Sequence, residues 1–141
     1  MEKPSKLYIV GSGVLDGKLK KEAEELNIQE HVVFTGQIET TYELLDKCDC
    51  FVFSSNHEGQ PMTLLESLSL NKPVIATDIP GNRSVLGDKY GYIIPNDENS
   101  LTEAMISYSK EKWENREVFD YVQYNENAMK KFYEVVCNMS E

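Results

Sequence analysis

Five short segments of this sequence are apolar at successive positions, and longer segments with apolar residues at helical spacing separate them. We expect the apolar segments to be β-strands at 6–10, 31–36, 50–54, 72–77 and 91–95. Such strands are buried on both faces, and strands joined through helices by short connections are parallel. The alternation therefore predicts an α/β fold, a doubly wound parallel sheet with helices on both faces.

The segments between the expected strands have the features of helices. Leu15, Leu19, Ala23 and Leu26 fall on one stripe of a helix with its period of 3.6 residues. We expect further helices at 40–47, 61–71 and 83–86, one capped by Asn99 or Ser100, and a tail at 117–139 in two pieces that break near 123–125. Because ligands bind beyond the carboxyl ends of parallel strands, the candidate loops are 11–14, 36–39, 54–60 and 78–82.

Length and charge limit the class of protein. The chain has 141 residues, of which 40% are hydrophobic and 27% charged, typical of one globular domain. Its formal charge of −10 would repel phosphate backbones, so we expect no nucleic-acid partner, although a local group of N–H donors can still bind a nucleotide. No apolar run approaches the roughly 20 residues of a membrane helix, and residues 1–6 lack a signal-peptide pattern.

The cysteines and histidines do not form a metal-binding pattern. Cys48, Cys50 and Cys137 are odd in number and lack C-x-x-C spacing, so we expect buried, reduced thiols. His31 and His57 are too few and too far apart to hold a metal. We therefore expect no metal and no cofactor.

The span 56–66 is the strongest candidate for a site. Glu58 is expected in the loop after an apolar strand, and Pro61 suits the first position of a helix. Glu66 then lies about one and a half turns inside that helix. The N–H groups of the first turn would point toward the loop, as an anion-binding site requires.

Other motifs agree less well with known chemistries. After Gly11 and Gly13, a dinucleotide fingerprint would need a third glycine at the position of Asp16, whose carboxylate would repel a pyrophosphate. The P-loop pattern also fails, and Ser54 and Ser55 lack the elbow motif of a serine hydrolase. The two glycines instead favour a tight turn or the close approach of a ligand.

Several side chains remain open to two interpretations. Taken alone, Glu58 and Glu66 fit a glycosidase pair, or more simply a helix-dipole partner and a solvated helix residue. His57 can carry a proton or donate to a substrate, or it can be a surface hydrogen-bonding group. Arg83 can bind an anion or pair with one of the many acids.

The ordered set of these segments resembles a known family. Glu58 and Glu66, with seven residues between them, resemble the E-x7-E signature of family-four retaining glycosyltransferases. The segments that agree with the family in order are 7–13, 32–36, 51–55, 73–77 and 91–95, so the resemblance covers residues 6–110, and 124–128 is similar to the family's closing helix.

The resemblance implies the GT-B fold, in which two Rossmann-like domains face each other across a cleft. Residues 1–141 resemble the C-terminal, donor-binding domain without its first strand and loop, and the acceptor-binding domain is absent. The basic residues that hold the pyrophosphate in the family belong to that loop. We therefore expect an incomplete domain that is inactive by itself.

The resemblance also implies roles for individual residues. Glu66 would accept hydrogen bonds from the ribose hydroxyls, and Glu58, the expected catalytic residue, would lie beside the transferred sugar. The residues whose backbone would hold sugar hydroxyls and phosphate are Gly59, Gln60, Pro61, Met62, Thr63 and Leu64. Those that would border the nucleotide and its base are Gly11, Gly13, Gly36, Gln37 and Ile38. Departures from the family pattern stand at Gln60, Pro61 and Ser84.

The implied function is that of an enzyme, a glycosyltransferase that moves a sugar from a nucleotide-diphospho-sugar to an acceptor in polysaccharide or glycoconjugate synthesis. The implied partners are the donor and a glycan or lipid-linked acceptor, which the missing domain would bind. We expect a cytoplasmic location. The resemblance also implies peripheral contact with the inner face of the membrane. Two alternatives stay open: a non-catalytic nucleotide- or partner-binding module of the same fold, and a nucleotide-sugar epimerase.

Overall fold

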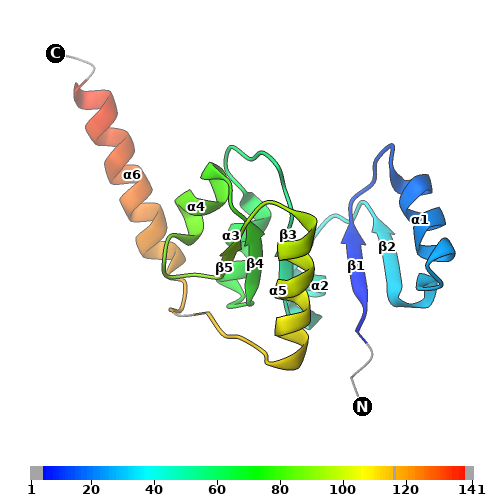
Figure 1. Ribbon diagram of the computed structural model, residues 1–141. Helices are drawn as coiled ribbons and strands as arrows, with labels where there is room; N and C mark the ends of the chain where they lie inside the picture. Colours follow the sequence, from blue (N-terminus) through cyan, green and yellow to red (C-terminus); the bar gives the residue numbers. More distant parts are fainter. Residues whose placement is uncertain (1–4, 116, 139–141) are drawn as a thin grey trace. The chain divides into compact units, whose positions relative to one another are not determined.

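Strands and helices alternate along the chain in the computed structural model, which describes residues 5–115 and 117–138 (Figure 1). The chain divides into two compact units, Met1–Thr41 and Tyr42–Glu141, and each is described by itself. In the described part of the chain, no helix combines the length and the apolar character that crossing a membrane requires.

The first unit contains one parallel strand pair and one α-helix. Its elements are β1 (Leu7–Val10), α1 (Asp16–Glu25), the 3-10 helix η1 (Gln29–His31) and β2 (Val32–Gly36). Both strands are where the sequence predicts them, and they pair with each other in parallel. The expected apolar stripe of the helix is buried only at Ala23, whereas Leu15 and Leu26 flank the helix and are exposed.

The second unit is a three-stranded parallel sheet with helices on both faces. Its elements are α2 (Tyr42–Lys47), β3 (Phe51–Phe53), α3 (Met62–Ser69), β4 (Val74–Thr77), α4 (Pro80–Leu86), β5 (Tyr92–Ile94), α5 (Glu98–Lys110) and α6 (Tyr121–Asn138). The strand order is β3-β4-β5. The predicted fold class is confirmed, but the five strands form two sheets instead of one, because β1 and β3 each pair with one strand among the described residues.

The central strand β4 carries the core of the second unit, and all four of its residues are buried. On one face a cluster of buried residues joins it to α3 and α4, and its members are Leu64, Leu68, Val74, Ala76, Val85, Leu86 and Phe119. On the other face a smaller cluster joins it to α5, with the members Ile75, Ala104 and Tyr108. The helix that follows the candidate loop is therefore fixed to the sheet through fully buried side chains.

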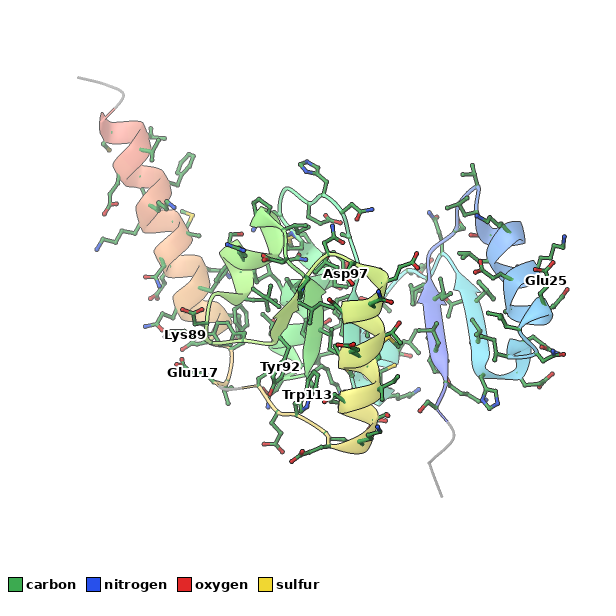
Figure 2. All side chains as sticks on the ribbon, in the orientation of Figure 1. Glu25, Lys89, Tyr92, Asp97, Trp113 and Glu117 are labelled. Atoms are coloured by element: carbon green, nitrogen blue, oxygen red, sulfur yellow. The ribbon has the colours of Figure 1, made fainter. Side chains whose placement is uncertain are left out.

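Trp113 and Glu117, which lie between α5 and α6, contact other parts of the second unit (Figure 2). The ring of Trp113 lies 4.1 Å from the ring of Tyr92 on β5, measured between centroids. Lys89 pairs with Glu117 at 3.2 Å on the surface. These contacts make the non-helical connection part of the folded unit.

The starts of two helices differ from their predicted positions. α4 begins at Pro80 instead of near residue 83, because the fixed φ of proline suits the first helical turn. α5 is capped by Asp97, whose carboxylate accepts the backbone N–H of Ser100 at 2.8 Å, and not by Asn99 or Ser100. A carboxylate at this position satisfies an N–H group that has no acceptor within the helix.

The tail forms one helix, and the predicted break near 123–125 is wrong. No glycine or proline interrupts this segment, and its amphipathic pattern continues through the predicted break. The Asp120 carboxylate accepts the N–H of Gln123 at 2.9 Å, so the polar residues that suggested a break lie in the first turn. Residues 117–120 precede the helix, and Met139 lies outside the described residues.

We expect Asp97→Ala to lower the stability of the second unit at neutral pH, because it removes the cap of α5. The backbone hydrogen bond from Ser100 lowers the pKa of Asp97 from its ordinary value of 3.8. A carboxylate whose pKa is lower in the folded state stabilises the fold above its unfolded pKa and loses this effect as the pH falls through its folded pKa. Urea unfolding should therefore show a lower free energy of unfolding for Asp97→Ala than for wild type at pH 7. This difference in free energy should shrink below about pH 4.

Asp97→Asn is the matched control, because it keeps a capping oxygen without a titrating group. At pH 7, Asp97→Asn should lose less free energy of unfolding than Asp97→Ala does. Equal losses in the two variants would contradict the capping role.

Candidate functional site

The two glutamates of the candidate span lie where the sequence predicts them. Glu58 is in the loop after β3, Glu66 is on α3, and both residues are half-buried. The Ser55 hydroxyl donates a hydrogen bond to Oε1 of Glu58 at 2.8 Å. His57 is exposed, and beside it the side chain of Asn56 accepts a hydrogen bond from that of Asn96 at 3.1 Å, which ties this loop to the one after β5.

Pro61 ends the loop instead of occupying the first helical position. It precedes α3 with φ −79° and ψ 87°, and its carbonyl accepts the N–H groups of Leu64 and Leu65 at 3.1 and 3.3 Å. Met62 and Thr63 come before this first bond, so their N–H groups lie at the end of the helix that favours anions. The side chain of Leu64 is fully buried and belongs to the core. Gly59 and Gln60 are exposed.

A series of hydrogen bonds supports the loop from the sheet. Thr77 Oγ1, at the end of β4, donates to the carbonyl of Ser55 at 2.6 Å, and Asn82 Nδ2 donates to the carbonyl of Thr77 at 2.9 Å. Thr77 and Asn82 are 2% and 0% exposed. Asn82 Oδ1 is buried without a hydrogen-bond partner among the described residues. No local sequence pattern marks Thr77 and Asn82 as part of the site, because a strand end and a helix outside the loop supply them.

Gly81, in the first turn of α4, lies against the backbone of Glu58. A Cβ added to Gly81 would be 2.5 Å from the carbonyl oxygen of Glu58 and 3.1 Å from its Cβ. Any side chain would therefore displace either the loop or the helix. The sequence predicts a loop at 78–82, whereas α4 begins at Pro80. The pair Pro80-Gly81 is the available signal for a helix start that allows a close backbone contact.

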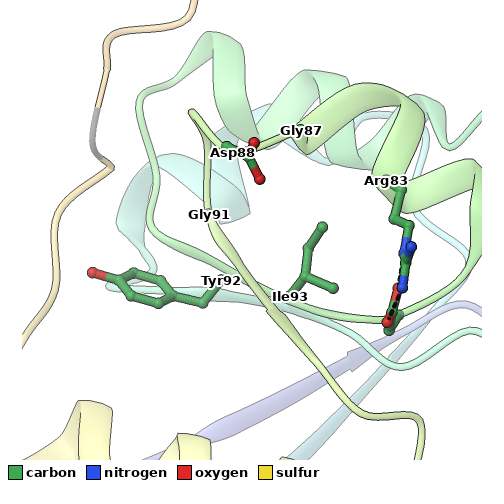
Figure 3. A pocket seen from close by; sticks show the side chains of 7 residues that line it. Arg83, Gly87, Asp88, Gly91, Tyr92 and Ile93 are labelled. Carbon is green, nitrogen blue, oxygen red and sulfur yellow. Dashed lines mark hydrogen bonds and ion pairs between the residues drawn. The ribbon is translucent and has the colours of Figure 1, made fainter.

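Arg83 pairs with an acid, which is one of its two predicted alternatives. Its guanidinium forms hydrogen bonds to both carboxylate oxygens of Asp78, and this pairing lowers the pKa of Asp78 and raises the pKa of Arg83 (Figure 3). The pair lines a hollow of about 410 Å³ with Gly87, Asp88, Gly91, Tyr92 and Ile93. Glu58 and Glu66 do not line this hollow, so it is separate from the candidate span.

The predicted donor-binding residues of the first unit form two turns that meet. Gly11 and Gly36 have φ of +112° and +67°, a region that favours glycine, and the N–H of Gly11 donates to the carbonyl of Gly36 at 2.8 Å. The N–H of Gly13 donates to the Asp16 carboxylate at 2.9 Å, where a dinucleotide fingerprint would present it to a phosphate. Gln37 and Ile38 are exposed.

The three cysteines are free thiols. Cys48 and Cys50 are half-buried, and burial raises the pKa of the Cys50 thiol to about 12, so it stays protonated at neutral pH. Cys137 is exposed on α6, so the prediction that it is buried was wrong. Among the described residues, no group of three or more His, Cys, Asp and Glu side chains is arranged to hold a metal ion.

Comparison with known proteins identifies the family. The family described as glycosyl transferases group 1 matches residues 1–126. The chain belongs to this family. A glycosyltransferase of Methanocaldococcus jannaschii is 45% identical over 83 residues, which are 58% of this chain and 20% of that protein. A 4-alpha-N-acetylgalactosaminyltransferase of Campylobacter jejuni, whose name refers to a diphospho-undecaprenol substrate, is 37% identical over 103 residues, 71% of this chain and 28% of that protein.

Several solved structures have the same fold. HepE of Anabaena, crystallised with UDP, has a TM-score of 0.73 over 92% of this chain and 41% of that protein, at 17% identity. TarM has a TM-score of 0.66 over 74% of this chain and 22% of that protein, at 28% identity. The predicted Rossmann-like, GT-B type of fold is confirmed. The chain thus spans less than half the length of each of these four proteins.

We expect Gly81→Ala to lower the free energy of unfolding of the second unit by about 1–3 kcal/mol, because the added methyl overlaps the Glu58 carbonyl. Chemical unfolding monitored by the intrinsic fluorescence of Trp113, in the same unit, measures this effect. Gly59→Ala is the matched control in the same unit, since the φ of Gly59 is outside the left-handed region and an added Cβ meets nothing within 4 Å. There the change should be neutral or stabilising by about 0.4–1 kcal/mol. Similar destabilisation in both variants would contradict the contact.

Proposed function

We propose that this chain is the donor-binding part of a retaining glycosyltransferase, which transfers a sugar from a nucleotide-diphospho-sugar to an acceptor. The observation that carries the proposal is the geometry of the loop after β3. Glu58 precedes α3, and Glu66 is the fifth residue of α3. The N–H groups of the first turn lie between the two glutamates in sequence. This supplies a carboxylate on each side of an anion-favouring helix end.

The two glutamates have different tasks in this proposal. Glu66 accepts hydrogen bonds from the ribose hydroxyls, and Glu58 lies beside the transferred sugar. The backbone of 59–64 binds the sugar hydroxyls and the diphosphate, with Met62 and Thr63 as the first-turn donors. The glycine turns of the first unit, with Gln37 and Ile38, keep the role that the resemblance implies, which is to border the nucleotide and its base.

The chemistry requires charge stabilisation at the leaving group. The bond between the anomeric carbon and the diphosphate oxygen breaks, and a bond from an acceptor hydroxyl to that carbon forms on the same face of the sugar. The acceptor proton passes to the departing diphosphate. N–H groups directed at a diphosphate that gains charge in the transition state lower the barrier, because they are already oriented before reaction. We expect no metal ion in this step.

Similar proteins support a nucleotide-sugar donor. HepE has been crystallised with UDP-glucose, and a pneumococcal O-GlcNAc transferase with UDP and GlcNAc. The names of two relatives refer to acceptors linked to diphospho-undecaprenol. We therefore propose a lipid-linked or glycan acceptor in polysaccharide or glycoconjugate synthesis, and a cytoplasmic protein with peripheral contact to the membrane.

The strand pairing supports an incomplete donor domain. In the Rossmann strand order 3-2-1-4-5-6, strand 1 pairs with both strand 2 and strand 4. If strand 1 is absent, strands 2 and 3 remain as a pair and strands 4, 5 and 6 as a triplet. The described chain has such a pair, β1-β2, and such a triplet, β3-β4-β5. We propose that a preceding strand and loop, together with an acceptor-binding domain, complete the enzyme.

Binding by the complete protein tests the proposal. Isothermal titration with UDP, GDP and their sugars should detect binding of one nucleotide, and Glu66→Ala should weaken it about tenfold or more, because hydrogen bonds from the ribose to a carboxylate are lost. Ser109→Ala is the control, since this serine is exposed on α5 and its hydroxyl donates to the nearby carbonyl of Ile106 at 2.7 Å. No binding of any of these nucleotides, or equal binding by Glu66→Ala, contradicts the proposal.

Product analysis separates the two alternatives. Transfer that requires an added acceptor supports the glycosyltransferase, whereas conversion of the donor sugar without any acceptor indicates an epimerase. Binding of a nucleotide without either reaction in the complete protein indicates a non-catalytic module.

A further inference from the structure

We propose that Ser55 and Thr77 are positioning residues for Glu58, and that Asn82 and Gly81 hold them and the loop in place. The inference rests on the proposed function, because it assigns to these residues the task of orienting the carboxylate beside the donor sugar. None of the four is expected to touch the substrate. Each acts through the position that it imposes on Glu58.

Ser55 orients the carboxylate directly. Its hydroxyl donates to Oε1 of Glu58 at 2.8 Å, and the two residues are three apart in the same loop. A single side-chain hydrogen bond restricts the rotation of a glutamate, which otherwise has three freely rotating side-chain bonds. Since Ser55 is a donor here, Glu58 acts as an acceptor at that oxygen.

Thr77 fixes the backbone of Ser55. Its hydroxyl lies 2.6 Å from the carbonyl of Ser55 and 3.4 Å from that of Phe53, so one buried side chain contacts the loop start and the end of β3. Thr77 is the last residue of the buried strand β4. The position of the serine is thereby tied to the most buried strand of the unit.

Asn82 fixes Thr77 in turn and does so at a cost. Its amide donates to the carbonyl of Thr77, while its own oxygen is buried without a partner among the described residues. An unpaired buried oxygen destabilises a fold, so an apolar residue of similar size would remove that cost. The fold retains the amide, and the bond to the end of β4 is the contact that it provides.

Gly81, in the first turn of α4, restricts the position of the Glu58 backbone. It is buried, and its missing side chain leaves room for the Glu58 carbonyl, which would be 2.5 Å from a Cβ. The backbone of Glu58 therefore rests on α4, while its carboxylate is held by Ser55. Two independent contacts restrict one residue, as a side chain that must face a sugar requires.

The first test measures the loop without any ligand. Backbone ¹⁵N relaxation at residues 56–60 should report larger ns-scale motion in Ser55→Ala and in Thr77→Val than in wild type, because each variant removes one hydroxyl of the series. Ser55→Thr, which keeps the hydroxyl, should restore the wild-type values. Thr102→Val is the control, since Thr102 is an exposed residue of α5 whose hydroxyl donates to the nearby carbonyl of Glu98. Unchanged motion in Ser55→Ala and Thr77→Val overturns the inference.

The second test measures catalysis by the complete protein with the donor that calorimetry selects. We expect kcat to fall about tenfold in Ser55→Ala and Thr77→Val, with the affinity for UDP or GDP within about twofold of wild type, and Ser55→Thr to recover most of the loss. Equal losses in kcat and nucleotide affinity, together with a lower unfolding midpoint, indicate a purely structural role and overturn the inference. If Glu66→Ala also leaves nucleotide binding unchanged, the proposed function itself fails, whereas failure of the Ser55 and Thr77 variants alone rejects only the positioning role.

Discussion

The complete burial of β4 is the constraint on which the rest of the second unit depends. Its side chains enter two cores, one shared with α3 and α4 and the other with α5, so three helices pack on one strand. The loop of Glu58, the start of α3 and the first turn of α4 all lie at the carboxyl ends of β3 and β4. A strand buried on both faces gives these three segments a rigid common base, because packed interiors resist small displacements.

The charges of the candidate site present a physical problem that the geometry answers. The chain carries a formal charge of −10, the site adds two carboxylates, and the proposed donor is itself anionic. Attraction must then come from local N–H dipoles at the start of α3, which act at short range, where overall charge is screened over about 8–10 Å in physiological salt. The basic residues of the proposed missing loop would add to it. With this division, a strongly acidic chain could bind the diphospho-sugar donor that we propose.

Much of the fold follows from local sequence patterns, and most of the site's support does not. The strands were predicted because apolar residues at successive positions allow few other structures, and the loop and helix positions of Glu58 and Glu66 follow from the same pattern. The predicted start of α4 near residue 83 and the predicted break in α6 are wrong. Pro80 begins α4, and the Asp120 carboxylate accepts an N–H group in the first turn of α6, which continues without a break. Thr77 donates to the loop at Ser55, 22 positions away, and Asn82 donates to Thr77, 5 positions away. Gly81 meets Glu58 across two elements, so only the assembled fold reveals these contacts.

In our proposal, Glu66 and the start of α3 hold the nucleotide while Glu58 faces the sugar. A crystal structure of the complete protein with its nucleoside diphosphate would show where the ligand binds. We expect ribose hydroxyls within about 2.7–3.2 Å of the Glu66 carboxylate and the diphosphate at the first turn of α3. A nucleotide bound away from α3, with its ribose out of reach of Glu66, would contradict the proposal.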